Sequence, residues 1–159
     1  MTTAPAKRGK LSIDRPSAGL RELAPLNPDC VVCGPENPSG LQLQFHSSKD
    51  AVWASWRPND HWASFKGTVH GGIVSTVLDE AMSKAVIATR YEALTAELRV
   101  RFRERIVPGD QLNVVGWVVD KRRGLIATEA LITCSNGREK AHAWGKFLIS
   151  RRDGQRRSE

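Results

Sequence analysis

The chain has 159 residues, of which 40% are hydrophobic, and this is enough for one packed domain and too much for a disordered chain. Its net charge of +7 lies mostly in the ends: residues 1–24 hold five basic and two acidic side chains, and residues 151–159 hold four and two. We therefore expect no nucleic-acid partner, and without a long apolar run or an apolar signal core we expect neither a membrane span nor secretion.

The first 40 residues lack a clear periodicity. Residues 1–24 are predicted to be a disordered basic tail, with a short helix near Leu20–Leu23, and residues 25–40 are rich in Pro, Asn and Asp, which is typical of irregular structure. Alternation over Leu41–Phe45 and an apolar run over Ala51–Trp56 predict two strands, followed by a loop over residues 61–69.

One long helix is predicted next, from about residue 71 to about residue 89. Apolar residues recur there at i, i+3, i+4 and i+7 and form one continuous face; they are Ile73, Val74, Val77, Leu78, Ala81, Met82, Ala85 and Val86.

Four further strands complete the pattern. Residues 96–102 alternate between apolar and charged side chains, which predicts a half-buried strand, whereas residues 111–119 are apolar on both faces, as in a covered central strand. Residues 125–134 and 139–150 follow, with the hairpin signal Asn136-Gly137 between them. We expect an α+β domain over residues 25–150, with a basic tail over residues 151–159. Since one helix cannot cover both faces of six antiparallel strands, we expect a second copy to pair with the first.

The most informative segment is the start of the helix. His70 is followed by Gly71 and Gly72, so no side chain shields the first amide groups, which have no partner within the helix and could hold an anion or an oxyanion. Asp79 lies two turns further, at the border of the apolar stripe near Ser75 and Met82, where it could face a crevice. A tight Gly-Gly turn and a solvent-facing Asp are the alternative interpretations.

The helix geometry limits how these groups can cooperate. Gly71 and Asp79 are separated by roughly 12 Å along the axis, so one small reacting group cannot contact both on the same helix. If both act on one substrate, they must come from two subunits, and the site would occur twice per dimer. A homodimer or a dimer of dimers is therefore expected.

Three motifs together resemble one known family. The His70-Gly71-Gly72 helix start with Asp79 nine residues after the His, the strand Thr95–Phe102, and Cys30-Val-Val-Cys-Gly34 followed by Asn37-Pro-Ser-Gly-Leu41 are similar to the hotdog-fold thioesterases, specifically the phenylacetyl-CoA thioesterase-like (PaaI-like) group. The resemblance covers residues 28–149. It implies a hotdog fold, in which a six-stranded antiparallel sheet wraps a long central helix and pairs across a dimer interface.

The resemblance also implies an activity and roles for single residues. The activity is hydrolysis of an acyl-CoA thioester to a carboxylic acid and free CoA. Asp79 would act as general base or nucleophile, the Gly71 and Gly72 amides would polarise the carbonyl, His70 would position it, and Thr95 would orient the attacking water. Glu80 points about 100° away from Asp79 on the helix and is not expected to share the site.

The substrate contacts are predicted from position. Trp62 would line the acyl pocket, with Ser75 and Met82 beside Asp79. Arg101 and Arg103, in a row of arginines on one strand face, would contact the CoA phosphates, unless that row is simply a solvated charged face. Acyl-CoA is then the only small-molecule partner, with no separate cofactor. A non-catalytic acyl-CoA-binding or ligand-sensing module is the alternative function. A hydratase is disfavoured because His70 and Asp79 are too far apart on one helix.

The cysteines indicate the compartment. Cys30, Cys33 and Cys134 are odd in number and follow no signal peptide, which favours a reducing, cytoplasmic location. Cys30 and Cys33 could be half of a zinc site, but the sequence supplies no second pair at the usual spacing. We therefore expect a structural turn with two buried thiols and no metal.

Overall fold

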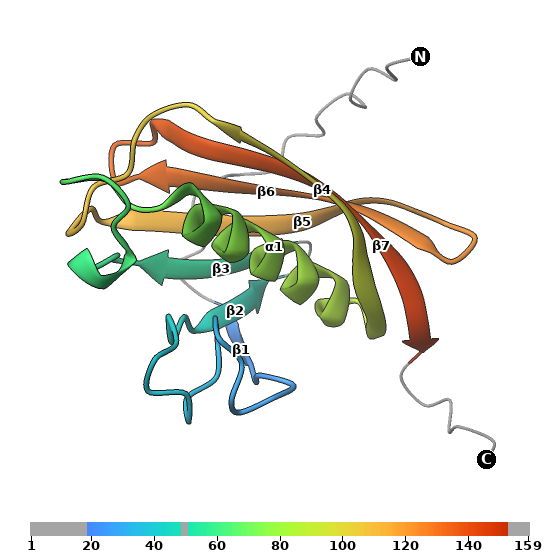
Figure 1. Cartoon of the computed structure of the whole chain (residues 1–159). Helices are drawn as coiled ribbons and strands as arrows, with labels where there is room; N and C mark the ends of the chain where they lie inside the picture. Colours follow the sequence, from blue (N-terminus) through green and yellow to red (C-terminus); the bar gives the residue numbers. More distant parts are fainter. Residues whose placement is uncertain (1–18, 49–50, 153–159) are drawn as a thin grey trace.

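A single long helix lies across one face of a curved antiparallel sheet (Figure 1). The computed structural model describes residues 19–48 and 51–152. Among these residues, no helix is long and apolar enough to cross a membrane. The elements in chain order are β1 (Arg21–Leu23), β2 (Phe45–Ser48), β3 (Ala51–Trp56), the 3-10 helix η1 (Asp60–Trp62), α1 (Gly71–Ala88), β4 (Tyr91–Phe102), β5 (Leu112–Arg122), β6 (Leu125–Cys134) and β7 (Glu139–Arg152).

The sheet has seven strands in the order β1-β2-β3-β5-β6-β7-β4, rather than the six predicted. The additional strand is β1, which forms where we predicted a short helix near Leu20–Leu23, because its backbone pairs with β2 about 25 residues later in the chain. It also brings this part of the predicted N-terminal tail into the sheet, while residues 1–18 lie outside the described residues. At the other end β7 continues to Arg152, and residues 153–159 lie outside them.

The predicted strand at Leu41–Phe45 is displaced. Leu43 and Phe45 are buried and their Gln neighbours are exposed, as the alternation predicted, but regular pairing begins only at Phe45. The reason is local: Gln42 has a φ of 52°, in the left-handed region, which interrupts an extended strand. Leu41 and Leu43 instead donate their amides to the carbonyls of Val31 and Val32, so they hold the preceding loop.

The helix packs closely on the sheet because two strand positions lack a side chain. A Cβ on Gly116 of β5 would lie 2.4 Å from the Ala81 carbonyl oxygen, and one on Gly145 of β7 would lie 2.9 Å from the Met82 sulfur. The predicted apolar face of α1 is buried against the sheet between these two glycines, and Val77, Leu78 and Ala81 are fully enclosed. Glycine inside a strand thus marks close backbone approach here.

Strand β4 forms an edge of the sheet, where its one partner is β7. The prediction of a half-buried strand over residues 96–102 is therefore wrong within a single chain: Leu98 is 38% exposed and Phe102 is 55% exposed. A register shift between Thr95 and Glu97 changes which side chains face α1. Thr95 faces the helix before the shift, and Leu98, Val100 and Phe102 share that face after it, since they pair with Gly145, Ala143 and Ala141 of β7.

Candidate active site

The first turn of α1 leaves one amide group free. His70 is the N-cap residue, and its Nδ1 accepts a hydrogen bond from the Gly72 amide at 2.9 Å. Because Nδ1 is an acceptor, a neutral His70 carries its proton on Nε2, which leaves an N–H donor on the exposed side of the ring. Gly71 is the first helical residue, and no acceptor among the described residues bonds its amide. Of the two predicted glycine amides, Gly71 is thus available to a ligand, whereas Gly72 is engaged by His70.

Asp79 and Thr95 are brought together by the fold. The Thr95 hydroxyl donates a hydrogen bond to Asp79 Oδ1 at 3.0 Å, which joins the middle of α1 to the edge strand β4. Thr95 reaches Asp79 because it faces the helix just before the β4 register shift. Asp79 is therefore partly covered and held from β4, not a freely solvated carboxylate.

Burial raises the pKa of Asp79 above that of an ordinary aspartate. The hydrogen bond from Thr95 works in the opposite direction, because it stabilises the carboxylate, and the negative charge of Glu80 adds a smaller upward effect. A carboxylate with a raised pKa is a stronger base, which suits a group that must accept a proton from water.

Glu80 turns away from Asp79, as expected. Its carboxylate lies 3.7 Å from the Lys84 ammonium and contacts the Cys33 thiol. Burial, together with the Glu80 contact, raises the pKa of Cys33 to about 12, so this thiol is protonated at neutral pH and is a poor nucleophile.

The residues predicted to contact substrate fall into different places. Ser75 bonds the Gly71 carbonyl at 2.9 Å, and Trp62 accepts the His70 amide on its carbonyl at 2.7 Å, so both brace the helix start. Met82 is fully enclosed in the core of the chain. Arg101 is exposed and pairs in register with His142, on the face of β4 turned away from α1. Arg103 bonds Glu139 and lines a pocket.

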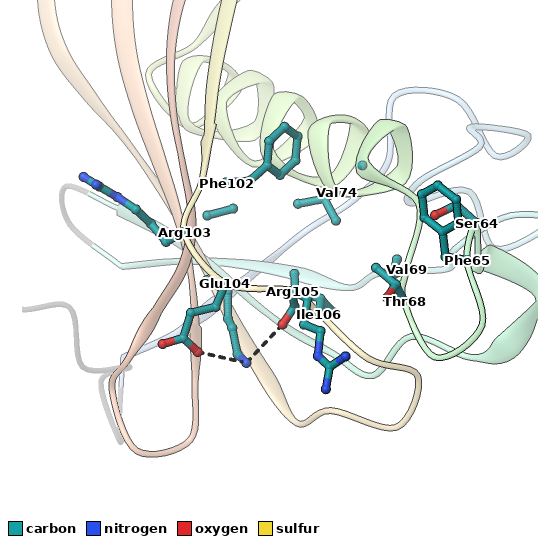
Figure 2. A pocket seen from close by; sticks show the side chains of 13 residues that line it. Ser64, Phe65, Thr68, Val69, Val74, Phe102, Arg103, Glu104, Arg105 and Ile106 are labelled. Carbon is teal, nitrogen blue, oxygen red and sulfur yellow. Dashed lines mark hydrogen bonds and ion pairs between the residues drawn. The ribbon is translucent and has the colours of Figure 1, made fainter.

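That pocket opens beside the start of α1 and has a volume of about 340 Å³ (Figure 2). Gly71, Val74 and Phe102 form part of its wall, and the loop after β4 supplies a charged rim. Arg105 stands on this rim and forms no ion pair with any carboxylate of residues 19–48 and 51–152, unlike Arg103. The sequence did not indicate Arg105 as a site residue. It lies beyond the part of the strand in which apolar and charged residues alternate, so the pattern could not predict which way its side chain faces.

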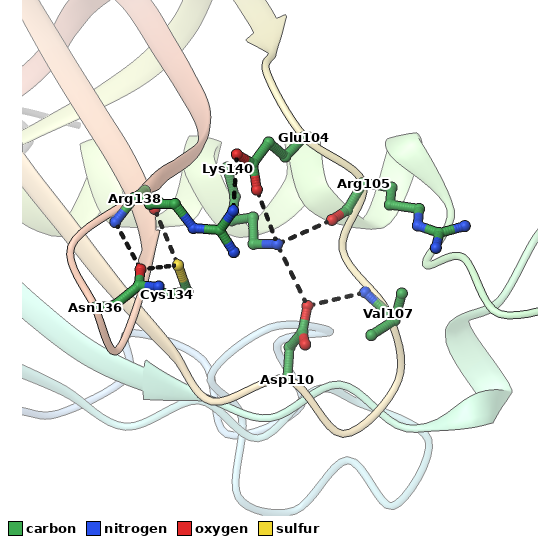
Figure 3. A network of polar contacts seen from close by, with 8 residues as sticks. All are labelled: Glu104, Arg105, Val107, Asp110, Cys134, Asn136, Arg138 and Lys140. Carbon is green, nitrogen blue, oxygen red and sulfur yellow. Dashed lines mark hydrogen bonds and ion pairs between the residues drawn. The ribbon is translucent and has the colours of Figure 1, made fainter.

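The rim is held in place by a network of polar contacts centred on Lys140 (Figure 3). The Lys140 ammonium donates to the Arg105 carbonyl at 3.2 Å and lies 3.3 Å from Glu104 and 3.9 Å from Asp110. Asp110 in turn accepts the Val107 amide at 3.0 Å. These bonds fix the backbone that carries Arg105, so the rim of the pocket is held in one conformation.

Comparison with known proteins finds one matching family model. Residues 66–141 match the family model described as "Thioesterase superfamily". A search of curated proteins finds no significant sequence match. These matched residues contain the helix start, Asp79, Thr95 and most of the residues that line the pocket.

Solved structures share the fold at low sequence identity. A thioesterase superfamily protein has a TM-score of 0.73 at 22% identity. The match covers 76% of this chain and 60% of that protein. A hypothetical thioesterase from Streptococcus pneumoniae TIGR4, solved with coenzyme A, has a TM-score of 0.67 at 18% identity, with 70% and 91% of the two chains covered. The Escherichia coli PaaI protein of the phenylacetic acid degradation operon has a TM-score of 0.67 at 16% identity, with 71% and 83% covered. The predicted hotdog fold is confirmed by these structures, and the family model supports the predicted resemblance to thioesterases.

Proposed function

We propose that this chain, in which residues 66–141 carry a thioesterase-superfamily domain, hydrolyses acyl-CoA thioesters to a carboxylic acid and free CoA. The observation that carries the proposal is the Asp79–Thr95 pair: a partly buried carboxylate of raised pKa, held at 3.0 Å by a hydroxyl on the edge strand. A protein that only bound acyl-CoA would have no need of a base at this position.

The chemistry follows from the groups available. Asp79 accepts a proton from water while the water oxygen attacks the thioester carbonyl carbon. The carbonyl oxygen gains negative charge, which the free Gly71 amide at the positive end of a helix can stabilise. When the tetrahedral intermediate collapses, the C–S bond breaks, the CoA sulfur takes up a proton, and the acid is released. Direct attack by Asp79 on the carbonyl would give the same products through an anhydride.

We propose that Gly71 and Asp79 in one site come from two chains. They lie eight residues apart on α1, or roughly 12 Å along the axis, too far to contact one thioester together. The exposed apolar side chains of β4 favour a partner along this edge: Leu94 and Phe102 are mostly open in one chain, and Phe102 lies beside Gly71. A second copy related by a two-fold axis would cover them and would build two equal sites.

The pocket at the helix start is the proposed site for CoA. Its apolar wall suits the pantetheine chain, and Arg105 on its rim can bind a phosphate oxygen, because its guanidinium is not paired with a carboxylate among the described residues. Arg103 is a second candidate, although it already bonds Glu139 at 3.1 Å. The solved structure of the S. pneumoniae relative with coenzyme A supports this choice of ligand class. Since acyl-CoA is an intracellular metabolite, the proposal includes the expected cytoplasmic location.

The test is release of free CoA thiol from a panel of acyl-CoA esters by wild-type protein and by Asp79→Asn. Asn keeps the size of the side chain and an acceptor for Thr95, so we expect the fold to persist and the rate to fall about 100-fold or more. Asp120→Asn, at a half-exposed strand carboxylate paired with Arg122, is the matched control and should keep wild-type rates. Equal turnover by Asp79→Asn would remove Asp79 from the mechanism. Calorimetric binding of acyl-CoA without any turnover by wild-type protein would leave the binding-module alternative.

A further inference from the structure

Cys30, Cys33 and Glu80 form a cluster that the thioesterase chemistry does not use. The two sulfurs and one Glu80 carboxylate oxygen all lie within 4.8 Å of one another. The sequence alone showed only two ligands, and the fold brings the third from α1, about 50 residues further along the chain. We propose that Cys30, Cys33 and Glu80 bind a zinc-class divalent cation, which ties the loop over residues 27–43 to α1 beside Asp79.

The loop already has the form of a metal-binding turn. The Val32 amide points at the Cys30 sulfur at 3.5 Å, a contact that stabilises a thiolate. The Gly34 amide closes the turn on the Cys30 carbonyl at 2.9 Å, and a Cβ on Gly34 would lie 2.3 Å from the Cys30 nitrogen. Glycine is therefore required directly after Cys33, and the closed turn holds Cys30 and Cys33 close together.

The donor set selects the ion. Two thiolates are soft ligands, which favour Zn²⁺ over Mg²⁺ or Ca²⁺, and Zn²⁺ also accepts the harder oxygen of one carboxylate. Three protein ligands leave a fourth tetrahedral position for water. A Zn–S bond of about 2.3 Å places two ligating sulfurs closer than 4.8 Å, so a small contraction of the cluster suffices.

Lys84 completes the charge balance. It is 1% exposed, and its ammonium lies 3.7 Å from Glu80 and 3.4 Å from the Ala24 carbonyl. Two thiolates and the carboxylate carry three negative charges, which a divalent ion and Lys84 together neutralise. A buried group of charges is tolerated only when it is compensated in this way. A simple disulfide between Cys30 and Cys33 would explain neither the carboxylate facing the sulfurs nor the charge left on it.

The test measures metal rather than activity. Full-length protein is reduced, stripped with a chelator and titrated with ZnCl2 in a calorimeter, and with CoCl2, whose tetrahedral thiolate complexes show sulfur-to-cobalt charge-transfer absorption. We expect one ion per chain. Cys33→Ser and Glu80→Gln should each weaken zinc binding by at least about 100-fold, the upper end of what even outer ligand partners contribute. Cys134→Ser is the matched control, because Cys134 bonds Asn136 and not the cluster, and it should bind zinc as wild type does.

Three results would overturn the proposal: no uptake of zinc by the reduced wild-type chain, uptake that Cys33→Ser leaves unchanged, or formation of a Cys30–Cys33 disulfide in its place. Full affinity in Glu80→Gln would exclude the third ligand. If Cys33→Ser does not fold, the wild-type protein still decides the matter. Zinc should then protect two of its three cysteines, Cys30 and Cys33, from alkylation in peptide maps, and equal labelling with and without zinc would reject the site.

Discussion

The Gly71 amide can be removed without disturbing the helix, and this gives a sharp test of the proposed oxyanion donor. Gly71 is the first helical residue, where proline is favoured because the amide has no partner within the helix. The preceding residue, His70, has φ −61° and ψ 131°, an extended conformation compatible with a following proline. Gly71→Pro should therefore fold normally and lack one N–H group.

Loss of one oxyanion donor typically lowers kcat about 100- to 1,000-fold, equivalent to roughly 2.7–4 kcal/mol. Gly71→Ala is the control, since it keeps the N–H group and its Cβ would lie 3.5 Å from the Phe102 ring, an ordinary van der Waals contact. We expect Gly71→Ala to stay within a few-fold of wild type in the thiol-release assay. A Gly71→Pro protein with wild-type kcat, or an alanine variant as slow as the proline variant, would refute the role of the amide.

The same variant can show whether the site is shared between chains. A mixed dimer of Gly71→Pro and Asp79→Asn has one site with both groups intact and one site with both defects. Random assembly makes about half of the dimers mixed, with one good site in two, so co-expressed chains should recover roughly one quarter of wild-type activity. If mixing restores nothing, the amide and the carboxylate do not meet across an interface.

Five further predictions concern pH, stability and binding. Because the pKa of Asp79 is raised, kcat/KM should fall at a higher pH than for an ordinary aspartate as the base is protonated, and the pH–rate profile measures this. The folded state binds the Asp79 proton more tightly than the unfolded chain, so the stability of the wild-type protein falls as pH rises from about 3.9 through the raised pKa. Asp79→Asn carries no charge at this position and should therefore have a higher melting temperature than wild type at neutral pH. This difference in melting temperature should vanish below about pH 3.9. Thr95→Val removes the bond that holds the pKa of Asp79 down, so the acid limb should move to still higher pH. Leu78→Ala, in the closed core, should cost about 2–5 kcal/mol in urea unfolding, whereas Leu26→Ala, at a 68% exposed position, should change stability by less than about 0.5 kcal/mol. Arg105→Ala should raise KM for acyl-CoA several-fold and leave KM for acyl-pantetheine unchanged, and an equal rise for both substrates would exclude a phosphate contact.

The regular elements were predictable because their periods are local. The helix was expected from about residue 71 to about residue 89 and runs from Gly71 to Ala88, and residues 125–134 form a strand with the predicted bounds. Strand β1 was not predictable, since three residues with no clear alternation become a strand only by pairing with β2. The displacement of the strand at residues 41–45 depends on the positive φ of Gln42, which alternation does not reveal.

The residues of the candidate site also fall into those that local spacing could predict and those that only the fold brings together. Asp79, His70 and Gly71 lie on one helix, so spacing alone could identify them as a group and could show that Asp79 is too far from Gly71 to act with it in one chain. Family resemblance suggested a role for Thr95 in orienting water, but its bond to Asp79 depends on the β4 register shift. Met82 illustrates the limit: its place beside Asp79 on the helical wheel was read correctly, but the sheet at Gly145 encloses it.

The amino-acid sequence by itself determined the elements whose apolar periods extend over several turns or strand residues, together with the spacing of groups along α1, because both depend on neighbours within a few positions. Only the tertiary structure decided which separate segments meet: Thr95 with Asp79, Arg105 with the pocket, and Cys30 and Cys33 with Glu80. Contacts of this kind depend on sheet order, a register shift and the close approach of a helix at two glycines. They are properties of the packed chain, and no local pattern encodes them.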